Sequence, residues 1–291
     1  MIYHTREVSR LNYRLDQKSV LAMLPDRDVN AHKGDFGRIL LLCGSRGYTG
    51  AAALAAMGAL RTGAGLVYLA VPECIYEIEA GKLLEAIVLP LPDHEGKISA
   101  DAWTDISDLL LRMDAVLFGP GLGCSEEISK LLGLLLTDYH GPLVLDADGI
   151  NCLSDHIDIV RGRAEPVVIT PHQGEFDRFR GCGCQDRTGD AVSVAQDLGI
   201  TVVLKGHHTI ITDGMDVYIN ETGNPGMAVG GSGDVLAGMI VSLIGQGIPA
   251  TQAAAMAVWL HGAAGDRCAA EIGQYGMLPS DMLSVIPRLM K

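Results

Sequence analysis

The sequence predicts an α/β fold in which a mostly parallel central sheet is flanked by helices on both faces. From residue 38 onward, short runs of β-branched residues and leucine alternate with longer stretches of helical spacing, which is the order that a parallel sheet requires. The chain has 291 residues, and 48% of them are hydrophobic, so it is long enough to bury one large core. We therefore expect a single domain over residues 31–291, preceded by a polar lead segment over residues 1–30.

The expected strands are short apolar runs that end near glycine, proline or a charged residue. In chain order they are Ile39–Cys43, Leu66–Val71, Ala86–Leu89, Ala115–Phe118, Leu143–Leu145, Val167–Thr170, Val202–Leu204 and Thr209–Thr212. The segments His208–Thr212 and Asp216–Asn220 are joined through Asp213–Gly214, which predicts an antiparallel hairpin at one edge of the sheet.

The expected helices have apolar residues every three or four positions, or long runs of small residues. After a short helix over Gln17–Met23 in the lead segment, they are Gly50–Thr62, Ala102–Leu111, Glu126–Leu136, Thr188–Leu198, Val235–Ile244, Ala250–Ala270 and Pro279–Met290. The segment Gly181–Asp186 predicts a loop.

Charge and composition exclude several classes of protein. The net charge of −13 argues against a nucleic-acid surface, so the expected partner is a small molecule. The first 18 residues are charged without an apolar core, and later apolar runs are broken well short of a membrane span. The seven cysteines are scattered, with no C-x-x-C pair, as is typical of free thiols in a reducing compartment. We therefore expect a soluble cytoplasmic protein that binds no membrane.

A glycine-rich loop in residues 224–234 is the most informative segment for function. Its glycines can present consecutive backbone N–H groups to an anion, and the apolar helix that follows adds its dipole. Asp234 lies at the junction of loop and helix, where a carboxylate beside a phosphate is unfavourable unless it handles a proton. The segment therefore predicts a phosphate site with Asp234 as catalytic base, while the alternative is that Asp234 caps the helix.

Further candidate site residues follow the carboxyl ends of the predicted strands, where the ligands of open α/β sheets bind. They are Gly119–Pro120–Gly121, Asp146, Asp148, Pro171–His172 and Lys205–Gly206. Lys205 ends a hydrophobic strand, and the turn through Thr209 offers further donors to a nucleotide phosphate; the alternative is a lysine that only reaches solvent. Asp146 and Asp148 either orient magnesium or cap a helix over Gly149–Leu153.

The segment after Thr170 places His172 and Glu175 in a polar turn, where both side chains can serve phosphate or metal chemistry or remain merely solvated. Gly44, Gly47 and Gly50 have the spacing G-x-x-G-x-x-G, which departs from the dinucleotide fingerprint of hydride-transfer enzymes. Such an enzyme remains an alternative, but it would leave the segments KGHHT and GGSGD without a task. A simpler role is that Gly50–Ala51 lets a flat ligand approach the backbone closely.

Taken in order, these motifs resemble the ADP-dependent NAD(P)H-hydrate dehydratase family. The residues that carry the resemblance are KGDFGRILLLCGS (33–45), YTGAA (48–52), FGPGLG (118–123), LDADGIN (145–151), TPHQGEF (170–176), VLKGHHT (203–209), NPGMAVGGSGDVLAG (224–238), WLHGAAGD (259–266) and LPSDM (278–282). The resemblance implies a ribokinase-like fold and a repair reaction. A hydrated NADH or NADPH loses water while ADP is converted to AMP and phosphate in bacteria, or ATP to ADP in eukaryotes.

The resemblance also implies roles for individual residues. Substrate contacts are implied at Ala51, Gly119, Gly121, His172 and Asp234. Nucleotide contacts are implied at Lys205, Gly206, His207, His208, Thr209 and Gly233. The segment from Thr170 also resembles the T-P-N-x-x-E turn of ribokinase-like kinases, which makes Glu175 the candidate for holding magnesium through water, although His172 replaces Asn. Gln173 stands where the family often has Pro, and Gly149 where it often has Ala.

Partners and alternatives follow from the same resemblance. Residues 1–30 are too few to form the epimerase domain fused to many relatives, so we expect a separate epimerase to act on the same substrate pool. A homo-oligomer, specifically a tetramer, is expected by resemblance only. Two other functions stay open on the residues: a small-molecule alcohol kinase of the same superfamily, and a nucleotide-binding module without catalysis, against which the retained Asp234 argues.

Overall fold

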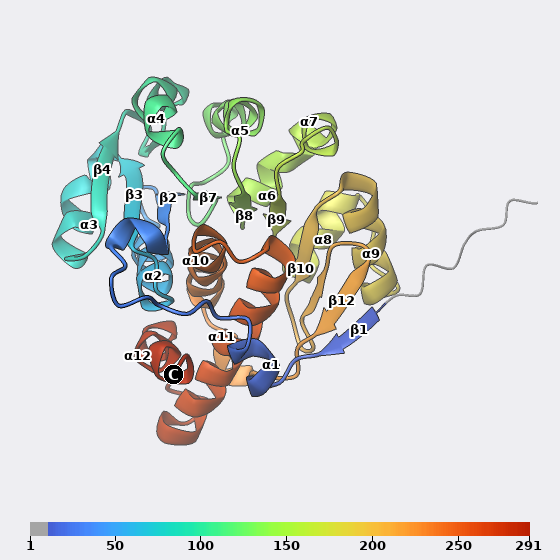
Figure 1. Ribbon diagram of the computed structural model, residues 1–291. Helices are drawn as coiled ribbons and strands as arrows, with labels where there is room; N and C mark the ends of the chain where they lie inside the picture. Colours follow the sequence, from blue (N-terminus) through green and yellow to red (C-terminus); the bar gives the residue numbers. More distant parts are fainter. Residues whose placement is uncertain (1–10) are drawn as a thin grey trace, which may run out of the picture.

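A ten-stranded sheet runs through the molecule, and helices cover both of its faces (Figure 1). The computed structural model describes residues 11–291. The strand order is β1-β12-β11-β10-β9-β8-β7-β2-β3-β4, and only β11 runs antiparallel to its neighbours. The strands of this sheet are β1 (Leu11–Arg14), β2 (Arg38–Leu42), β3 (Leu66–Pro72), β4 (Ile87–Leu91), β7 (Ala115–Phe118), β8 (Leu143–Leu145), β9 (Val167–Ile169), β10 (Thr201–Leu204), β11 (Ile210–Thr212) and β12 (Asp216–Ile219).

A separate short hairpin joins two further strands. These are β5 (Asp93–His94) and β6 (Lys97–Ile98). The helices are α1 (Gln17–Leu21), α2 (Thr49–Arg61), α3 (Tyr76–Lys82), α4 (Trp103–Leu110), α5 (Glu126–Asp138), α6 (Asp148–Leu153), α7 (Ile157–Arg161), α8 (Gln173–Arg180), α9 (Arg187–Leu198), α10 (Ser232–Gly245), α11 (Ala250–Ile272) and α12 (Pro279–Leu289).

Alternating side chains of the sheet build two hydrophobic cores. Along β2, Ile39 and Leu41 face one core, and Leu40 and Leu42 face the other. The first core is shared with α2, α10, α11 and α12, and the second with α4, α5 and α9. In Figure 1 these two groups of helices lie on opposite sides of the sheet. Since both faces are covered, the strands read as continuous apolar runs, which is why the sequence reveals them.

Two glycines allow α10 to pack closely against α2. An added Cβ on Gly238 would lie 2.0 Å from the Ala55 carbonyl oxygen, and one on Gly58 would lie 2.5 Å from the Val235 carbonyl oxygen. Any larger residue at either position would collide with backbone. The start of α10, which carries Asp234, is therefore fixed relative to α2.

The structure confirms every predicted strand to within two residues at each end and corrects several other expectations. The hairpin of β11 and β12 is present, but β12 is not an edge strand, because β1 pairs with it in parallel. We did not predict β1, since its four residues lie in a polar segment too short to show alternation. The helices α3 and α7 were also missed, and α8 replaces the expected polar turn after β9. Within residues 11–291, no helix is both long and apolar enough to cross a membrane.

Candidate active site

The predicted site residues lie at the carboxyl edge of the sheet, around the point where the strand order changes direction. From β2 the chain proceeds through β3 and β4 on one side, and from β7 through β8, β9 and β10 on the other. Backbone hydrogen bonds link the loops that follow these strands: Gly44 N donates to Pro120 O at 2.8 Å, and Lys205 N donates to Pro171 O at 2.8 Å. Such a switch point is where open α/β sheets bind ligands.

An ion pair lies at the centre of this edge. Lys205 Nζ donates to Asp146 Oδ1 at 2.8 Å, and the Thr170 hydroxyl donates to the same oxygen at 2.6 Å. The Asp146 side chain is 3% exposed and that of Lys205 is 20% exposed, so the lysine side chain is largely buried and its partner almost completely. Asp146 therefore holds Lys205 in place at the mouth of β10, and the lysine is not merely extended into solvent.

The glycine loop brings the start of α10 against this ion pair. An ideal Cβ on Gly233 would lie 3.3 Å from Lys205 Nζ and 3.9 Å from Asp146 Oδ2. The helix begins at Ser232, three residues earlier than the sequence predicts, and its N-cap residue is Gly231. Asp234 therefore lies inside the first turn, so the alternative in which it caps the helix is wrong.

Burial and neighbouring charges shift two pKa values in this cluster. The pKa of Asp234 is raised to about 6, first by burial and second by the nearby Asp146 carboxylate, while Lys205 opposes the rise. For Lys205, burial lowers the pKa, but the carboxylates of Asp146, Glu175 and Asp234 outweigh it and the pKa is raised. At neutral pH the site thus combines a protonated amine with a carboxylate of unusually high proton affinity.

His172 and Glu175 form a capping box at the start of α8. His172 Nδ1 accepts from Glu175 N at 3.2 Å, and Glu175 Oε2 accepts from His172 N at 2.8 Å. His172 also forms an isolated parallel bridge with Lys205, which places the start of α8 beside the mouth of β10. The Glu175 side chain is 8% exposed, whereas that of His172 is 55% exposed. Glu175 therefore has a structural task of its own, and His172 is open to a ligand.

The turn from Lys205 to Thr209 has an unusual backbone. Gly206 has a φ of +149° and His208 has a φ of +56°, a region that side chains rarely adopt. The Thr209 hydroxyl donates to Gly206 O at 2.9 Å and accepts from Gly206 N at 3.3 Å, so it closes the turn. His207 and His208 are exposed, with ring centroids 4.0 Å apart. Thr209 thus fixes the shape of the turn, and the side chains of the two histidines are exposed on it.

Gly121 and Ala51, which are both expected to contact the substrate, lie beside one another. An ideal Cβ on Gly121, whose φ is +65°, would lie 2.9 Å from Ala51 Cβ, so this turn packs directly on the start of α2. Gly119 has a φ of +136°, and an added Cβ would lie 1.8 Å from Asp146 O. Only glycine fits at position 119, where the turn after β7 crosses the loop after β8.

The two aspartates of the loop after β8 have different tasks. Asp146 binds Lys205, as described, whereas Asp148 Oδ2 accepts from Gly123 N at 2.8 Å and holds the glycine turn after β7. Asp148 is the first residue of α6, so it neither caps that helix nor faces the same point as Asp146. The sequence shows only that the two aspartates are separated by one residue, and this spacing does not distinguish their roles.

The helix α11 supports the glycine loop through Asp266 and His261. Both belong to the motif WLHGAAGD (259–266), but the sequence did not predict this contact. Asp266 Oδ2 accepts from Gly223 N at 2.8 Å, and Asp266 Oδ1 accepts from Asn224 Nδ2 at 3.0 Å. His261 lies 3.5 Å from the Ser232 hydroxyl, and burial lowers the pKa of His261 to about 4. The helix α11 therefore holds the loop from below, with an imidazole that stays neutral at physiological pH.

The chain offers little direct ligation for a metal. Within the part of the chain that the structure describes, no group of three His, Cys, Asp or Glu side chains could hold one. Magnesium, however, is usually bound by one or two carboxylates together with waters and substrate phosphates. Glu175, which lies close enough to Lys205 to raise its pKa, fits a magnesium ion that arrives with a nucleotide and is contacted through water.

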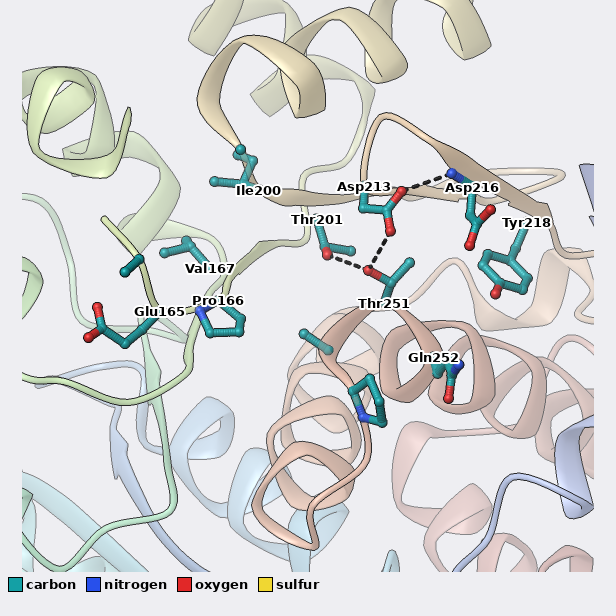
Figure 2. A pocket seen from close by; sticks show the side chains of 14 residues that line it. Glu165, Pro166, Val167, Ile200, Thr201, Asp213, Asp216, Tyr218, Thr251 and Gln252 are labelled. Carbon is teal, nitrogen blue, oxygen red and sulfur yellow. Dashed lines mark hydrogen bonds between the residues drawn. The ribbon is translucent and has the colours of Figure 1, made fainter. Parts of the chain in front are cut away.

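A cavity of about 330 Å³ lies at the opposite edge of the sheet, and it contains none of the predicted site residues (Figure 2). It opens beside Val167 and Thr201, which begin β9 and β10. Thr251 hydrogen-bonds to Thr201 at 2.8 Å and to Asp213 at 3.4 Å across it. The side chains of Thr201, Thr251 and Asp213 thus bind one another in this cavity, and the predicted site residues lie at the other edge.

Comparisons with known proteins agree with this geometry. A family model described as NAD(P)H-hydrate dehydratase matches residues 39–288. The chain is 42% identical over 277 residues to a bifunctional NAD(P)H-hydrate repair enzyme of Moorella thermoacetica, covering 93% of this chain and 52% of that protein. It is 36% identical over 268 residues to an ADP-dependent (S)-NAD(P)H-hydrate dehydratase of Lactiplantibacillus plantarum, covering 91% of each.

Solved structures of similar proteins have the same fold as this chain. An ADP/ATP-dependent NAD(P)H-hydrate dehydratase from Bacillus subtilis, co-crystallised with ATP and Mg²⁺, superposes with a TM-score of 0.81 at 32% identity, covering 94% of this chain and 96% of that one. A ribokinase-like superfamily protein from Enterococcus faecalis superposes with a TM-score of 0.84 at 28% identity, covering 96% and 95%. The predicted fold class, ribokinase-like with a mostly parallel sheet, is confirmed.

Proposed function

The chain belongs to the NAD(P)H-hydrate dehydratase family, and from this premise we propose that it restores NAD(P)H from its (6S) hydrate at the expense of ADP, which becomes AMP and phosphate. The chain spans about half the length of the bifunctional relatives it matches, at 52% of the Moorella protein. The proposal therefore concerns the dehydration step alone.

We assign the roles of the site by the same premise. The hydrate would contact Ala51, Gly119, Gly121, His172 and Asp234. The nucleotide would contact Lys205, Gly206, His207, His208, Thr209 and Gly233. The observation that supports this best is the approach of Gly233 to the ion pair of Lys205 and Asp146, because it aligns a helix N-terminus and a cation on one point.

The chemistry explains why a dehydratase would need a phosphoryl donor. Hydroxide is a poor leaving group, and phosphate is a good one. Asp234 would take the proton of the hydrate hydroxyl. The oxygen of that hydroxyl would attack the terminal phosphorus of ADP, and the bond from this phosphorus to AMP would break. The lone pair of the ring nitrogen would then expel phosphate, and loss of a proton from the neighbouring carbon would restore the dihydronicotinamide.

The surrounding groups stabilise the charge that develops during the transfer. Lys205, held by Asp146, and the amides at the start of α10 would bind the oxygens of the phosphoryl group. Glu175 would help to hold a magnesium ion through water, and that ion would supply further positive charge to the phosphoryl transfer. The pKa of about 6 for Asp234 suits a base that is ionised at neutral pH and still has a substantial proton affinity.

The decisive experiment follows dihydronicotinamide absorbance in a mixture of protein, magnesium, ADP and the (6S) hydrate of NADPH. We expect absorbance to rise only when nucleotide is present, with one phosphate released for each NADPH formed. The Asp234→Asn variant should bind ADP as the wild type does but turn over about 10²–10⁴ times more slowly, because the base is lost. Near-normal turnover by this variant would assign the base to another residue.

The same mixture separates the proposal from its alternatives. A small-molecule kinase would leave the absorbance flat and consume nucleotide only with a different alcohol, and a binding module would bind ADP without consuming it. Replacing ADP by ATP in a parallel series measures nucleotide preference.

We further propose the setting in which the enzyme works. All seven cysteines are free thiols, which supports a cytoplasmic location. A separate epimerase would supply the (6S) form, as the bifunctional nature of the relatives suggests. A homo-oligomer, specifically a tetramer, is expected, and light scattering coupled to gel filtration measures it directly against the 30.8 kDa chain.

A further inference from the structure

Arg187 connects the turn after β10 to the start of α8, beside the proposed nucleotide site. It is the first residue of α9, and its guanidinium group lies against the turn that follows β10. Nη1 donates to His207 O at 2.9 Å, and Nη2 donates to Lys205 O at 3.2 Å and to Leu204 O at 3.3 Å. Nε donates to the Gln173 side chain at 3.1 Å. One side chain thus binds three carbonyl oxygens of a single turn and the first residue of α8.

These contacts hold a backbone that its own sequence does not favour. His208 adopts a left-handed conformation, and an added Cβ on Gly206 would lie 2.9 Å from Arg187 Nη2. The glycine therefore admits the guanidinium group, and the guanidinium group in turn satisfies carbonyl oxygens at a point where the β ladder has ended. The fixed fork of donors makes arginine suitable, whereas a lysine has no such planar arrangement.

The charge of Arg187 is also available to a ligand. Within residues 11–291, no carboxylate lies within ion-pair distance of its guanidinium group, whereas Arg161, Arg163 and Arg180 each have at least one. A cation without an acidic partner, half-buried beside Lys205, attracts a polyanion such as a nucleoside diphosphate.

We propose that Arg187 is a positioning residue of the nucleotide site. It shapes the turn from Lys205 to Thr209 so that the turn can receive the phosphates, and through Gln173 it fixes that turn relative to the helix that begins beside His172. The inference rests on the proposed function, since it assumes that this turn receives a nucleotide.

The test compares two arginines that bind backbone carbonyl groups. Arg163 donates to the carbonyl oxygens of Leu136, Tyr139 and Gly141 at 2.6 Å each, and it precedes β9 at the far edge of the sheet. Arg187→Lys, Arg187→Gln and Arg163→Lys would be compared with the wild type by calorimetric titration with ADP, by steady-state kinetics and by thermal unfolding.

Both Arg187 variants should raise the Kd and KM for ADP by about tenfold, as expected for loss of hydrogen bonds from a charged group, while kcat changes far less. Arg163→Lys should lower Tm and leave the Kd for ADP unchanged. If the Arg187 variants lose stability too, Gln173→Met serves as a milder variant, because it removes one acceptor of the guanidinium group and should raise the Kd about threefold.

The outcomes are distinguishable. Wild-type affinity for ADP in all the Arg187 and Gln173 variants, or an equal loss of affinity in Arg163→Lys, would overturn the positioning role. Failure of the wild type itself to bind ADP would instead refute the proposed function, and this inference with it.

Discussion

Asp234, a half-buried carboxyl group, links the stability of the fold to the proposed activity. Its pKa is about 6 in the folded protein against an ordinary value of 3.8, so the folded state binds the proton more tightly than the unfolded state. The stability that this group contributes is present below pH 3.8 and is lost as the pH rises through about 6. At neutral pH the ionised Asp234 therefore destabilises the fold.

Replacing Asp234 by Asn should consequently stabilise the protein at pH 8. A shift of about two pKa units corresponds to an upper limit of about 3 kcal/mol, and partial exposure reduces this to about 1–2 kcal/mol. Urea unfolding at pH 8 and pH 5 measures the effect, which should be smaller at pH 5. A variant that is no more stable than the wild type at pH 8 would contradict the raised pKa.

At the scale of elements, the contact between α2 and α10 is the most sensitive to side-chain size. Gly238→Ala should cost at least about 2 kcal/mol, because its Cβ would meet the backbone of α2 and neither helix can yield locally. The start of α10 would shift as well, so turnover should fall by an order of magnitude or more in the protein that remains folded.

Gly81→Ala is the matched control for that substitution. Gly81 lies exposed in α3 with open space around its Cβ position, so alanine should stabilise the helix by about 0.5–1 kcal/mol. Urea unfolding and the absorbance assay measure both variants. If Gly238→Ala were as stable as Gly81→Ala, the close packing of α2 on α10 would be wrong.

The elements also show what the sequence can and cannot predict. The interior strands were predictable because each is buried on both faces, as with Ala115–Phe118. The helix α8 was not, because half of its residues are charged and its capping box uses His172 instead of the usual Ser, Thr, Asp or Asn. The motifs identified Lys205 and Asp234, but not the link from Lys205 to Asp146 or the contacts of Arg187, which join residues far apart in the chain.

At the scale of the molecule, the sheet separates the site from the N-terminal strand. Among residues 11–291, the strand β1 pairs with β12 alone, where Tyr13 stacks on Tyr218 at 4.9 Å and Arg14 binds Glu221. The site residues lie over β7 to β10 instead. We therefore expect this strand to contribute to the stability of the fold and not to the proposed site.

A chain that begins at Leu15 should be less stable but bind ADP normally. Loss of the cross-strand pairs of β1 should lower the free energy of unfolding by about 1–3 kcal/mol and expose the edge of β12 to association. Urea unfolding, light scattering and calorimetric titration with ADP check the three effects. Loss of ADP binding by the folded, shortened chain would show that β1 acts on the site.

The glycine contact between α2 and α10 has a consequence for motion. Ala51 lies in the first turn of one of these helices and Asp234 in the first turn of the other, and two tightly interlocked helices shift as a rigid body. The proposed substrate contact at Ala51 and the proposed base at Asp234 therefore move together.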